Sequence, residues 1–424
     1  MKNNPIQEPF QGFIEDTSKM NWQRKSIRNL LGKLAQFILW RYQPKIVGIT
    51  GSIGKTSTTQ FTETILSKKF TTRTVDEDFT TDIAVSASIL GIKAFRKFKK
   101  GLKHIPKLLY NLIIPQKYPQ ILILELRSQK KGRIRYLSKL VRPKIGVVTA
   151  VAPSHMEHFK DLKTVFIEKK ALAECIPKHG LVILNFDDQK VRDMASSTQA
   201  KVFYFGLDKR ADIWVDKIKV SLEGLRFNLH FENKSYIVHA PGIINKYHIY
   251  PILAAVACAH FLGMKMNEII LALKDLKPAE GRGNKVLGPK SSILINDTFN
   301  ANPKSTCASL EILEDIAGDR RKIGVLGNML ELGPFKEKGH EEVGRKAAKI
   351  VDLLITSGNL TKIIAQEAIR YGLPKEKVFV TENSEEAASL LQSKIQEGDI
   401  ILVKGSHGAR MRKVIDTLKS DKIE

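Results

Sequence analysis

Residues Gly48–Thr59 read GITGSIGKTSTT and directly follow the short apolar run Lys45–Val47. An apolar strand that breaks into a glycine turn and continues as a helix is a common way to cradle phosphates, because glycines let backbone N–H groups approach an anion. The stretch therefore predicts a strand–turn–helix unit that binds the phosphates of a nucleotide.

The residues of this turn have separate expected tasks. Lys55 would neutralise the β- and γ-phosphates of ATP, and the Thr56 hydroxyl would bind Mg²⁺. Ile49 stands where the first glycine of the pattern G-x-x-x-x-G-K-[ST] belongs, so a glycine turn without a ligand remains the alternative. We interpret the stretch as an ATP site, and its expected binding residues are Gly51, Ser52, Gly54, Lys55, Thr56 and Ser57.

The rest of the chain alternates apolar runs with helical patterns, which is typical of α/β layers. The runs that predict buried parallel strands are Gln120–Leu124, Ile145–Thr149, Leu181–Leu184, Ile293–Ile295, Lys322–Leu326, Leu353–Ile355 and Ile400–Val403. The helical patterns are Thr56–Ser67, Thr164–Ile176, Ile249–Leu262, Pro303–Ile316, Gly339–Ile350 and Glu385–Lys394. Ala211–Ala240 instead contains short alternating runs and predicts a small inserted antiparallel meander.

Three parts are expected along the 424 residues. Residues 1–44 form a short segment in which Met20–Arg41 predicts one basic amphipathic helix. Residues 45–282 form a central ATP-binding domain around a parallel sheet. Residues 283–424 form a C-terminal Rossmann-like α/β domain, and the stretch Pro278–Gly283 (PAEGRG) is the expected linker.

Composition limits the class of protein. The three cysteines, Cys175, Cys258 and Cys307, share no metal-ligand spacing and suit a reducing cytosol. The first residues do not resemble a signal peptide, and no apolar run approaches the length of a transmembrane helix. We expect a soluble, cytoplasmic and monomeric protein.

The formal net charge of +25 is concentrated in one region, because Glu125 is the only acidic residue from Gly91 to Lys144. Three interpretations stay open. They are a solvated basic face, attraction of a polyanionic substrate such as a nucleotide sugar, and contact of Ile92–Pro115 with an anionic membrane surface. Nucleic-acid binding is not favoured, because no nucleic-acid module accompanies the charge.

Two further side chains are expected near the phosphates. Glu125 ends the run QILIL and His155 follows the strand Ile145–Thr149. Both therefore lie at carboxyl ends of strands, where open α/β sheets bind ligands. A carboxylate and an imidazole beside a phosphate loop are candidate metal ligands. Taken alone, His155 is compatible with an ordinary loop histidine, and Lys169 on the following helix with a solvated lysine.

Three polar loops follow strands in the second half of the chain. They are Asn296–Ser305 (NDTFNANPKS) and the ends of Ile323–Gly333 (IGVLGNMLELG) and Val403–Met411 (VKGSHGARM). Because each loop follows a strand, we expect them to form one face of a second nucleotide-type sheet.

Together these motifs resemble the ATP-dependent Mur ligases, which build the stem peptide of peptidoglycan. The resemblance runs from about Lys45 to Ile415 and rests on GSIGKTST, the Glu125 strand, TAVAPSHMEHF, the Lys169 helix followed by LNFDD, GRG, NDTFNANP, VLGNMLELG and VKGS. NANP together with the G-x-M-x-E-L-G stretch resembles the branch that adds D-alanyl-D-alanine to UDP-MurNAc-tripeptide.

The resemblance implies an activity, its cofactors and its partners. ATP with Mg²⁺ would phosphorylate the carboxylate of a UDP-MurNAc-peptide. D-Ala-D-Ala or a similar amine would then attack the acyl phosphate, and phosphate would leave. The ATP and amine sites would lie on different domains, so domain closure would bring them together.

The resemblance also implies roles for single residues. The implied catalytic residues are Lys55, Glu125, His155 and Lys169. The implied metal ligands are Thr56, Glu125, His155 and Lys169, the last as a carbamate, with Lys170 as a less favoured register. The implied nucleotide contacts beyond the glycine turn are Asn245, Arg282, Asp297 and Asn300. Asn302 lies in the same loop as Asn300 and is expected near the nucleotide or the incoming amine. Family-like positions with looser roles are Glu331, His340, Lys404 and Ser406.

The sequence departs from the family in several places. Only 44 residues precede the first predicted strand, so the usual N-terminal domain for the UDP end does not fit. Either the basic stretch Lys97–Lys107 substitutes for it or the substrate differs. The family has glutamate followed by a glycine or a similar small residue, where this chain has Glu125-Leu126-Arg127. Ile244-Asn245 stands where the family has an adenine-contacting His-Asn pair, and His248 lies near the later Asn position. Asn296 and Asn328 replace frequent aspartates.

Other classes of protein stay open. A P-loop ATPase acting on nucleic acid would account for the charge, but not for the NANP and KGS loops. An inactive Mur-like binding protein would account for the altered residues, but not for an intact set of candidate catalytic side chains. Among ligases, a folylpolyglutamate synthetase is an alternative. So is an amidotransferase-linked Mur-like protein, although the sequence does not contain the cysteine-rich insert typical of it.

Overall fold

The computed structural model describes residues 22–74, 82–91, 114, 117–128, 130–152 and 161–419. His155 and most of the basic stretch Ile92–Pro115 therefore lie outside the described residues. The chain divides into two compact units, Met1–Pro44 with Val75–Tyr118 and Lys45–Thr74 with Pro119–Glu424. Among the described helices, none combines the length and the apolar character needed to cross a membrane.

The first unit contains helices α1 (Trp22–Tyr42) and α3 (Asp82–Ile89), which pack against each other. The helix predicted at Met20–Arg41 is thereby confirmed to within two residues. Its last residue, Tyr42, stacks on Tyr118 with ring centroids 4.6 Å apart. The Tyr118 hydroxyl donates to the Ile89 carbonyl over 2.8 Å, which fixes the end of α3.

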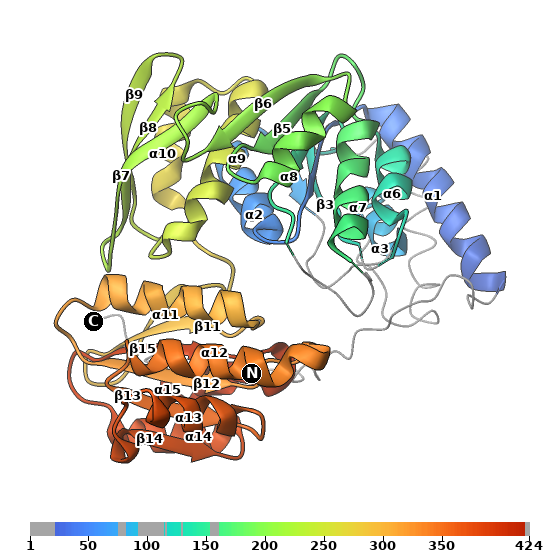
Figure 1. Cartoon of the computed structure of the whole chain (residues 1–424). Coiled ribbons are helices and arrows are strands. Elements are labelled where there is room, and N and C mark those ends of the chain that lie inside the picture. The colour runs from blue at the N-terminus through green and yellow to red at the C-terminus, as the bar shows by residue number, and fades with distance from the viewer. Residues whose placement is uncertain are drawn as a thin grey trace. The chain divides into compact units, whose positions relative to one another are not determined.

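The described strands of the first sheet follow the order β2-β3-β1-β4-β5-β6-β7-β8-β9 (Figure 1). Their bounds are β1 Lys45–Thr50, β2 Thr72–Thr74, β3 Ile121–Glu125, β4 Ile145–Val148, β5 Leu181–Asn185, β6 Lys201–Gly206, β7 Ile213–Ser221, β8 Gly224–Phe231 and β9 Lys234–Ala240. In sheet order, the strands from β2 to β7 are parallel, and β8 is antiparallel to its neighbours β7 and β9. The predicted meander is therefore β7–β9. It is not a separate insert, because β7 pairs with β6 and so extends the sheet.

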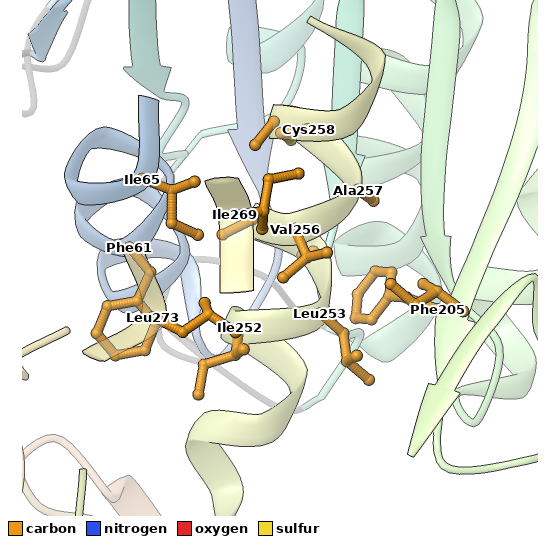
Figure 2. Close-up of a cluster of buried hydrophobic side chains, with 14 of the residues drawn as sticks. Phe61, Ile65, Phe205, Ile252, Leu253, Val256, Ala257, Cys258, Ile269 and Leu273 are labelled. Carbon is orange, nitrogen blue, oxygen red and sulfur yellow. The ribbon is translucent and has the colours of Figure 1, made fainter. Parts of the chain in front are cut away.

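Helices cover both faces of this sheet. One face carries α2 (Lys55–Leu66), α9 (Ile249–Phe261) and α10 (Met266–Ala272), whose apolar side chains form the main core with the strands. Figure 2 shows this core, with α9 between Phe61 and Ile65 of α2 and Phe205 of β6. The opposite face carries α7 (Leu162–Cys175). A side chain at Gly48 of β1 would point to that face and contact Leu172 of α7. The remaining described helices here are α6 (Arg133–Val141), which packs on α7, and α8 (Gln189–Arg192).

The second sheet has the order β10-β11-β15-β12-β13-β14, with only the β10 edge antiparallel in the described residues. Its strands are β10 Asn284–Leu287, β11 Ile293–Asp297, β12 Lys322–Gly327, β13 Leu353–Ser357, β14 Val378–Thr381 and β15 Ile400–Lys404. Its helices are α11 Pro303–Ala317, α12 Lys336–Ala348, α13 Thr361–Arg370, α14 Ser384–Lys394 and α15 Arg412–Leu418. The first three helices share one apolar cluster, and α14 and α15 share another.

The predicted α/β fold class is confirmed by these two layered sheets. Because β11, β15 and β12 are adjacent and parallel, the three polar loops that follow them lie at one edge, as predicted. The division into domains at residues 44 and 282 stays a prediction.

Candidate active site

The glycine turn between β1 and α2 has a conformation that other residues would strain. Gly51 has φ +146°, and a Cβ there would lie 2.0 Å from Thr149 Oγ1. Gly54 has φ +83° and precedes the first residue of α2. Ser52 fixes the turn to the end of β4, since its N–H donates to the Ala150 carbonyl over 2.8 Å and its hydroxyl donates to the Ala152 carbonyl over 2.9 Å. Side chains at Gly51 and Gly54 would therefore strain the turn, and its binding of phosphate stays a prediction.

The Thr56 hydroxyl is the point on which the polar side chains converge. It donates to Glu125 Oε2 over 3.0 Å and accepts from Arg127 Nη2 over 3.1 Å and from Arg282 Nη2 over 3.2 Å. A hydroxyl has one proton and two acceptor positions, so these three partners use its whole capacity. Thr56 itself is 4% exposed.

Glu125 lies at the last position of β3 and forms a two-point ion pair with Arg127. Arg127 Nε donates to Oε1 over 2.7 Å, and Nη2 donates to Oε2 over 3.1 Å. Burial works against the charge of this carboxylate, but the charge and hydrogen bonds of Arg127, with help from Lys55 and Thr56, outweigh it. The pKa of Glu125 is therefore lowered, and the carboxylate is ionised at neutral pH.

Lys55 extends from the first position of α2, and its ammonium donates to the Ser52 carbonyl over 3.3 Å. Burial lowers its pKa to about 7, and Glu125 works in the opposite direction. Repulsion by three further cationic side chains adds to the lowering, namely Lys169, Arg127 and Arg282. An anion bound here would favour the charged form of Lys55.

Lys169 lies on α7 and is 3% exposed, so it is not the solvated lysine that a helical position alone suggests. Burial lowers its pKa to about 8, against the opposing effect of Glu168 and Glu125. Lys170 instead forms an ion pair with Glu174 on the same helix over 3.0 Å. Of the two adjacent lysines, Lys169 is therefore the one that senses the charge of Glu125.

Glu168 fixes α7 to the start of α6, a role that sequence reasoning missed. Its carboxylate is 2% exposed and accepts from the N–H groups of Gly132 over 2.6 Å and Ile134 over 2.7 Å. Both partners are backbone groups, which carry no residue-specific signal in the sequence.

Several predicted nucleotide contacts have local structural partners. Asn245 caps the turn before α9, because its Oδ1 accepts from the Tyr247 N–H over 2.8 Å. Asn302 caps α11 in the same way through the Ser305 N–H at 2.9 Å. Arg282 is placed at the phosphate turn through Thr56, with its guanidinium 3.9 Å from the centre of the Phe299 ring.

Asp297 and Lys404 form a partly buried pair at the ends of β11 and β15. Asp297 Oδ2 accepts from Lys404 Nζ over 2.5 Å and from the Ser309 hydroxyl over 2.6 Å. Lys404 is 2% exposed and also donates to the Asn300 carbonyl over 3.1 Å. The Asn300 side chain accepts from the next backbone N–H, that of Ala301. These groups therefore form hydrogen bonds with one another within the second sheet.

The remaining family-like positions hold the polar loops of the second sheet in place. His340 is fully buried and accepts from the Met329 N–H over 3.2 Å, and Ser406 Oγ accepts from the Leu330 N–H over 2.9 Å. Glu331 is exposed and has φ +62°. A cavity of about 540 Å³ opens beside these loops and is lined by Asn328, Gly358, Asn383, Gly408 and Arg410, among others.

Among the described residues, no cluster of three or more His, Cys, Asp or Glu side chains could hold a metal ion. The oxygens of Thr56 and Glu125 are of the kind that Mg²⁺ prefers, but Arg127 already contacts both. His155 lies outside the described residues. The metal-binding roles of Thr56, Glu125, His155 and Lys169 stay predictions.

Two family models match the chain. The Mur ligase middle domain matches residues 49–259, and the Mur ligase glutamate ligase domain matches residues 281–407. The chain belongs to the Mur ligase family. The first match contains the glycine turn, Glu125 and Lys169. The second contains Arg282, the first two polar loops and the start of the third.

Individual Mur ligases resemble the chain over most of its length. The UDP-N-acetylmuramoyl-tripeptide–D-alanyl-D-alanine ligase of Bacillus subtilis is 25% identical over 92% of this chain and 79% of its own. The crystal structure of MurF from Acinetobacter baumannii has a TM-score of 0.78 at 23% identity, over 92% of this chain and 80% of that one. MurF from Thermotoga maritima in complex with ADP has a TM-score of 0.77 at 22% identity, over 92% and 83%. These structural likenesses support the Mur ligase fold.

Proposed function

We propose that this Mur ligase is an ATP-dependent, ADP-forming amide ligase of peptidoglycan precursor synthesis. It would join D-Ala-D-Ala, or a closely similar amine, to the carboxylate of UDP-MurNAc-tripeptide. The observation that carries the proposal is the position of Lys55 and Glu125 at the glycine turn, with Lys169 close enough to both to influence them electrostatically. The named relatives, which are ligases of this type, support the choice of substrates.

The charge of the site supports a polyanionic substrate. Lys55, Lys169, Arg127 and Arg282 are all close enough to influence one another or Glu125 electrostatically. Glu125 and Glu168 balance part of this positive charge, and Glu168 also accepts two backbone N–H bonds. Preorganised cations of this kind stabilise the charge that develops during phosphoryl transfer.

The reaction would proceed in two steps. A carboxylate oxygen of the tripeptide attacks the γ-phosphorus of ATP, and the bond to the ADP oxygen breaks. The amine then attacks the acyl carbon, loses a proton and displaces phosphate to leave the amide. Lys55 and Arg282 would hold the phosphates. Thr56 and Glu125 would orient the cationic side chains around the phosphates. Mg²⁺ would supply further positive charge at the transferred phosphoryl group.

Lys169 would contribute as a carbamate, the role that family resemblance implies. Its neutral amine would add CO₂ and release one proton, which converts a cation into an anionic metal ligand. The lowered pKa of Lys169 supports this role, because only the neutral amine reacts with CO₂.

The proposal also concerns the setting of the enzyme. We propose the domains 1–44, 45–282 and 283–424, and a monomer that works in the cytoplasm, where nucleotide-linked precursors and ATP are available. Contact with an anionic membrane surface is supported by α1, on which Leu30, Phe37 and Trp40 are 57%, 43% and 70% exposed beside the exposed Lys33.

The test is phosphate release from Mg-ATP with UDP-MurNAc-tripeptide, with and without D-Ala-D-Ala, together with mass detection of the product. We expect release that depends on the dipeptide and a UDP-MurNAc-pentapeptide product. Dipeptide-independent release, or a product without the dipeptide, would contradict the assigned amine. If no phosphate were released with either substrate, the proposed carboxylate would be wrong.

A further inference from the structure

Arg127 lies in the place that a divalent cation would take between Thr56 and Glu125. Its Nη2 donates both to Thr56 Oγ1 over 3.1 Å and to Glu125 Oε2 over 3.1 Å. Those are the two oxygens at which a phosphate-site metal ion would be expected. A guanidinium and a metal ion are both positive and cannot share these oxygens at contact distance.

The position of Arg127 follows from the backbone. Leu126 is fully buried, its N–H donates to the Ile49 carbonyl over 2.8 Å, and its carbonyl accepts from the Thr50 hydroxyl over 2.9 Å. In an extended chain, side chains two positions apart point to the same side. Anchoring Leu126 in the core therefore directs Glu125 and Arg127 together toward the glycine turn.

Displacement of Arg127 by a metal ion would break a strong contact. The pair is bidentate, with Nε to Oε1 at 2.7 Å, and the Glu125 side chain is 8% exposed. Two-point pairs between arginine and carboxylate are among the strongest charge-assisted hydrogen bonds. A metal ion entering this position would first have to separate the Arg127 guanidinium from Glu125.

We propose that Arg127 supplies the positive charge between Thr56 and Glu125 that a divalent cation would otherwise supply, so that the nucleotide binds without a metal ion at this position. The proposal rests on the assignment of the glycine turn as the ATP site. Metal ions required for turnover would use other ligands, so nucleotide binding and turnover would differ in their dependence on metal.

The experiment measures the Kd of ADP by calorimetry on the full chain, in excess Mg²⁺ and in EDTA. ADP is chosen because it binds without reacting. For the unchanged protein we expect the two Kd values to agree within about threefold. For Arg127→Ala we expect the Kd in EDTA to rise at least about tenfold and to recover in Mg²⁺, because the vacated position can then accept the metal ion.

Two further variants control the result. Arg135→Ala removes the same charge from α6, where Arg135 pairs with Glu174 outside the site, and should leave both Kd values unchanged. Arg127→Lys keeps the charge without the two-point geometry. It should bind ADP in EDTA more tightly than Arg127→Ala, which matters if the alanine variant folds poorly.

The outcomes separate this inference from the proposed function. If the unchanged protein loses at least about tenfold in affinity in EDTA and Arg127→Ala behaves the same way, Arg127 does not replace a metal ion and the inference is wrong. If the unchanged protein binds no ADP in either buffer, the ATP site itself is wrong and the inference falls with it.

Discussion

The carboxyl edges of the two sheets place similar polar residues at similar positions but balance their charges differently. At the first sheet, Glu125 faces an excess of cations, and Lys55 is bound only weakly, at 3.3 Å from a carbonyl. At the second sheet, Lys404 is matched by Asp297 at 2.5 Å, and the pair is closed by Ser309 and the Asn300 carbonyl. Around Glu125 the cationic side chains outnumber the carboxylates, whereas Lys404 is matched by Asp297.

This difference shows why a position at the end of a parallel strand does not by itself identify a ligand contact. Both edges satisfy the rule that open α/β sheets bind ligands there. Only the first has surplus charge that a phosphate group would neutralise. An ATP contact by Asp297 would have to use the oxygen that Lys404 and Ser309 leave available, or else break the partly buried pair.

Replacing Lys55 with Ala tests the carboxyl edge of the first sheet and has the largest expected effect on activity. Loss of a cation at the transferred phosphoryl group should lower kcat/KM by about 1,000-fold. The fold should be retained, because Lys55 makes only one weak hydrogen bond in the described structure. Ligation kinetics and the thermal melting temperature check both statements. Lys68→Ala, at an exposed ion pair just after the same helix, is the control, and ligation at the normal rate by Lys55→Ala would refute the phosphate role.

Replacing Lys169 with Ala should lower kcat by about 100-fold, with partial recovery when a short carboxylic acid supplies the missing anion. Lys170→Ala should remain close to the unchanged protein, since Lys170 pairs with Glu174 instead. Full activity of Lys169→Ala without any added acid would remove Lys169 from the site.

The same lysine gives a pH dependence. With a pKa of about 8, the neutral amine of Lys169 becomes more abundant as the pH rises from 7 to 9. At limiting bicarbonate and saturating ATP, kcat should therefore rise over this range in the unchanged protein but not in Lys169→Ala rescued by acid. If the dependence of kcat on pH were the same at all bicarbonate concentrations, carbamylation of Lys169 would be excluded.

Replacing Lys404 with Met tests the carboxyl edge of the second sheet and should lower the free energy of unfolding. The Asp297 carboxylate would lose its buried partner, at a cost of about 2 kcal/mol in the free energy of unfolding. Lys322→Met, at a looser and more exposed pair with Asp352 of 3.7 Å, should change stability by less than about 0.5 kcal/mol. Urea unfolding measures both. Equal stabilities of the two variants would mean that the Lys404 pair contributes no more than a surface pair.

The sequence predicted the main strands to within about two residues, because each is a short, fully buried apolar run. Strands β6, β10 and β14 were not predicted. Strands β10 and β14 lie at sheet edges and are partly exposed, whereas β6 lies inside the first sheet but is buried only in part. The three-residue strand β2 (TRT) has no apolar signal at all.

Within the site, the sequence located the residues but not their partners. Asp297 and Lys404 are 107 positions apart, and they meet because the register of β11 and β15 places them side by side. Arg127 was visible as a departure from the family pattern. Its contact with Thr56 could not be predicted, because it depends on how a long side chain is oriented by the anchoring of Leu126.

The Glu168 carboxylate limits the movement of α7 relative to α6 during the catalytic cycle. Rotation or sliding of α7 would break two hydrogen bonds from the N–H groups of Gly132 and Ile134 to a buried charge, and bonds to charged groups are among the more costly to lose. These bonds therefore fix the orientation of α7, which keeps Lys169, rather than Lys170, turned toward Glu125. Domain closure that brings the ATP and amine sites together would then move α6 and α7 as one unit.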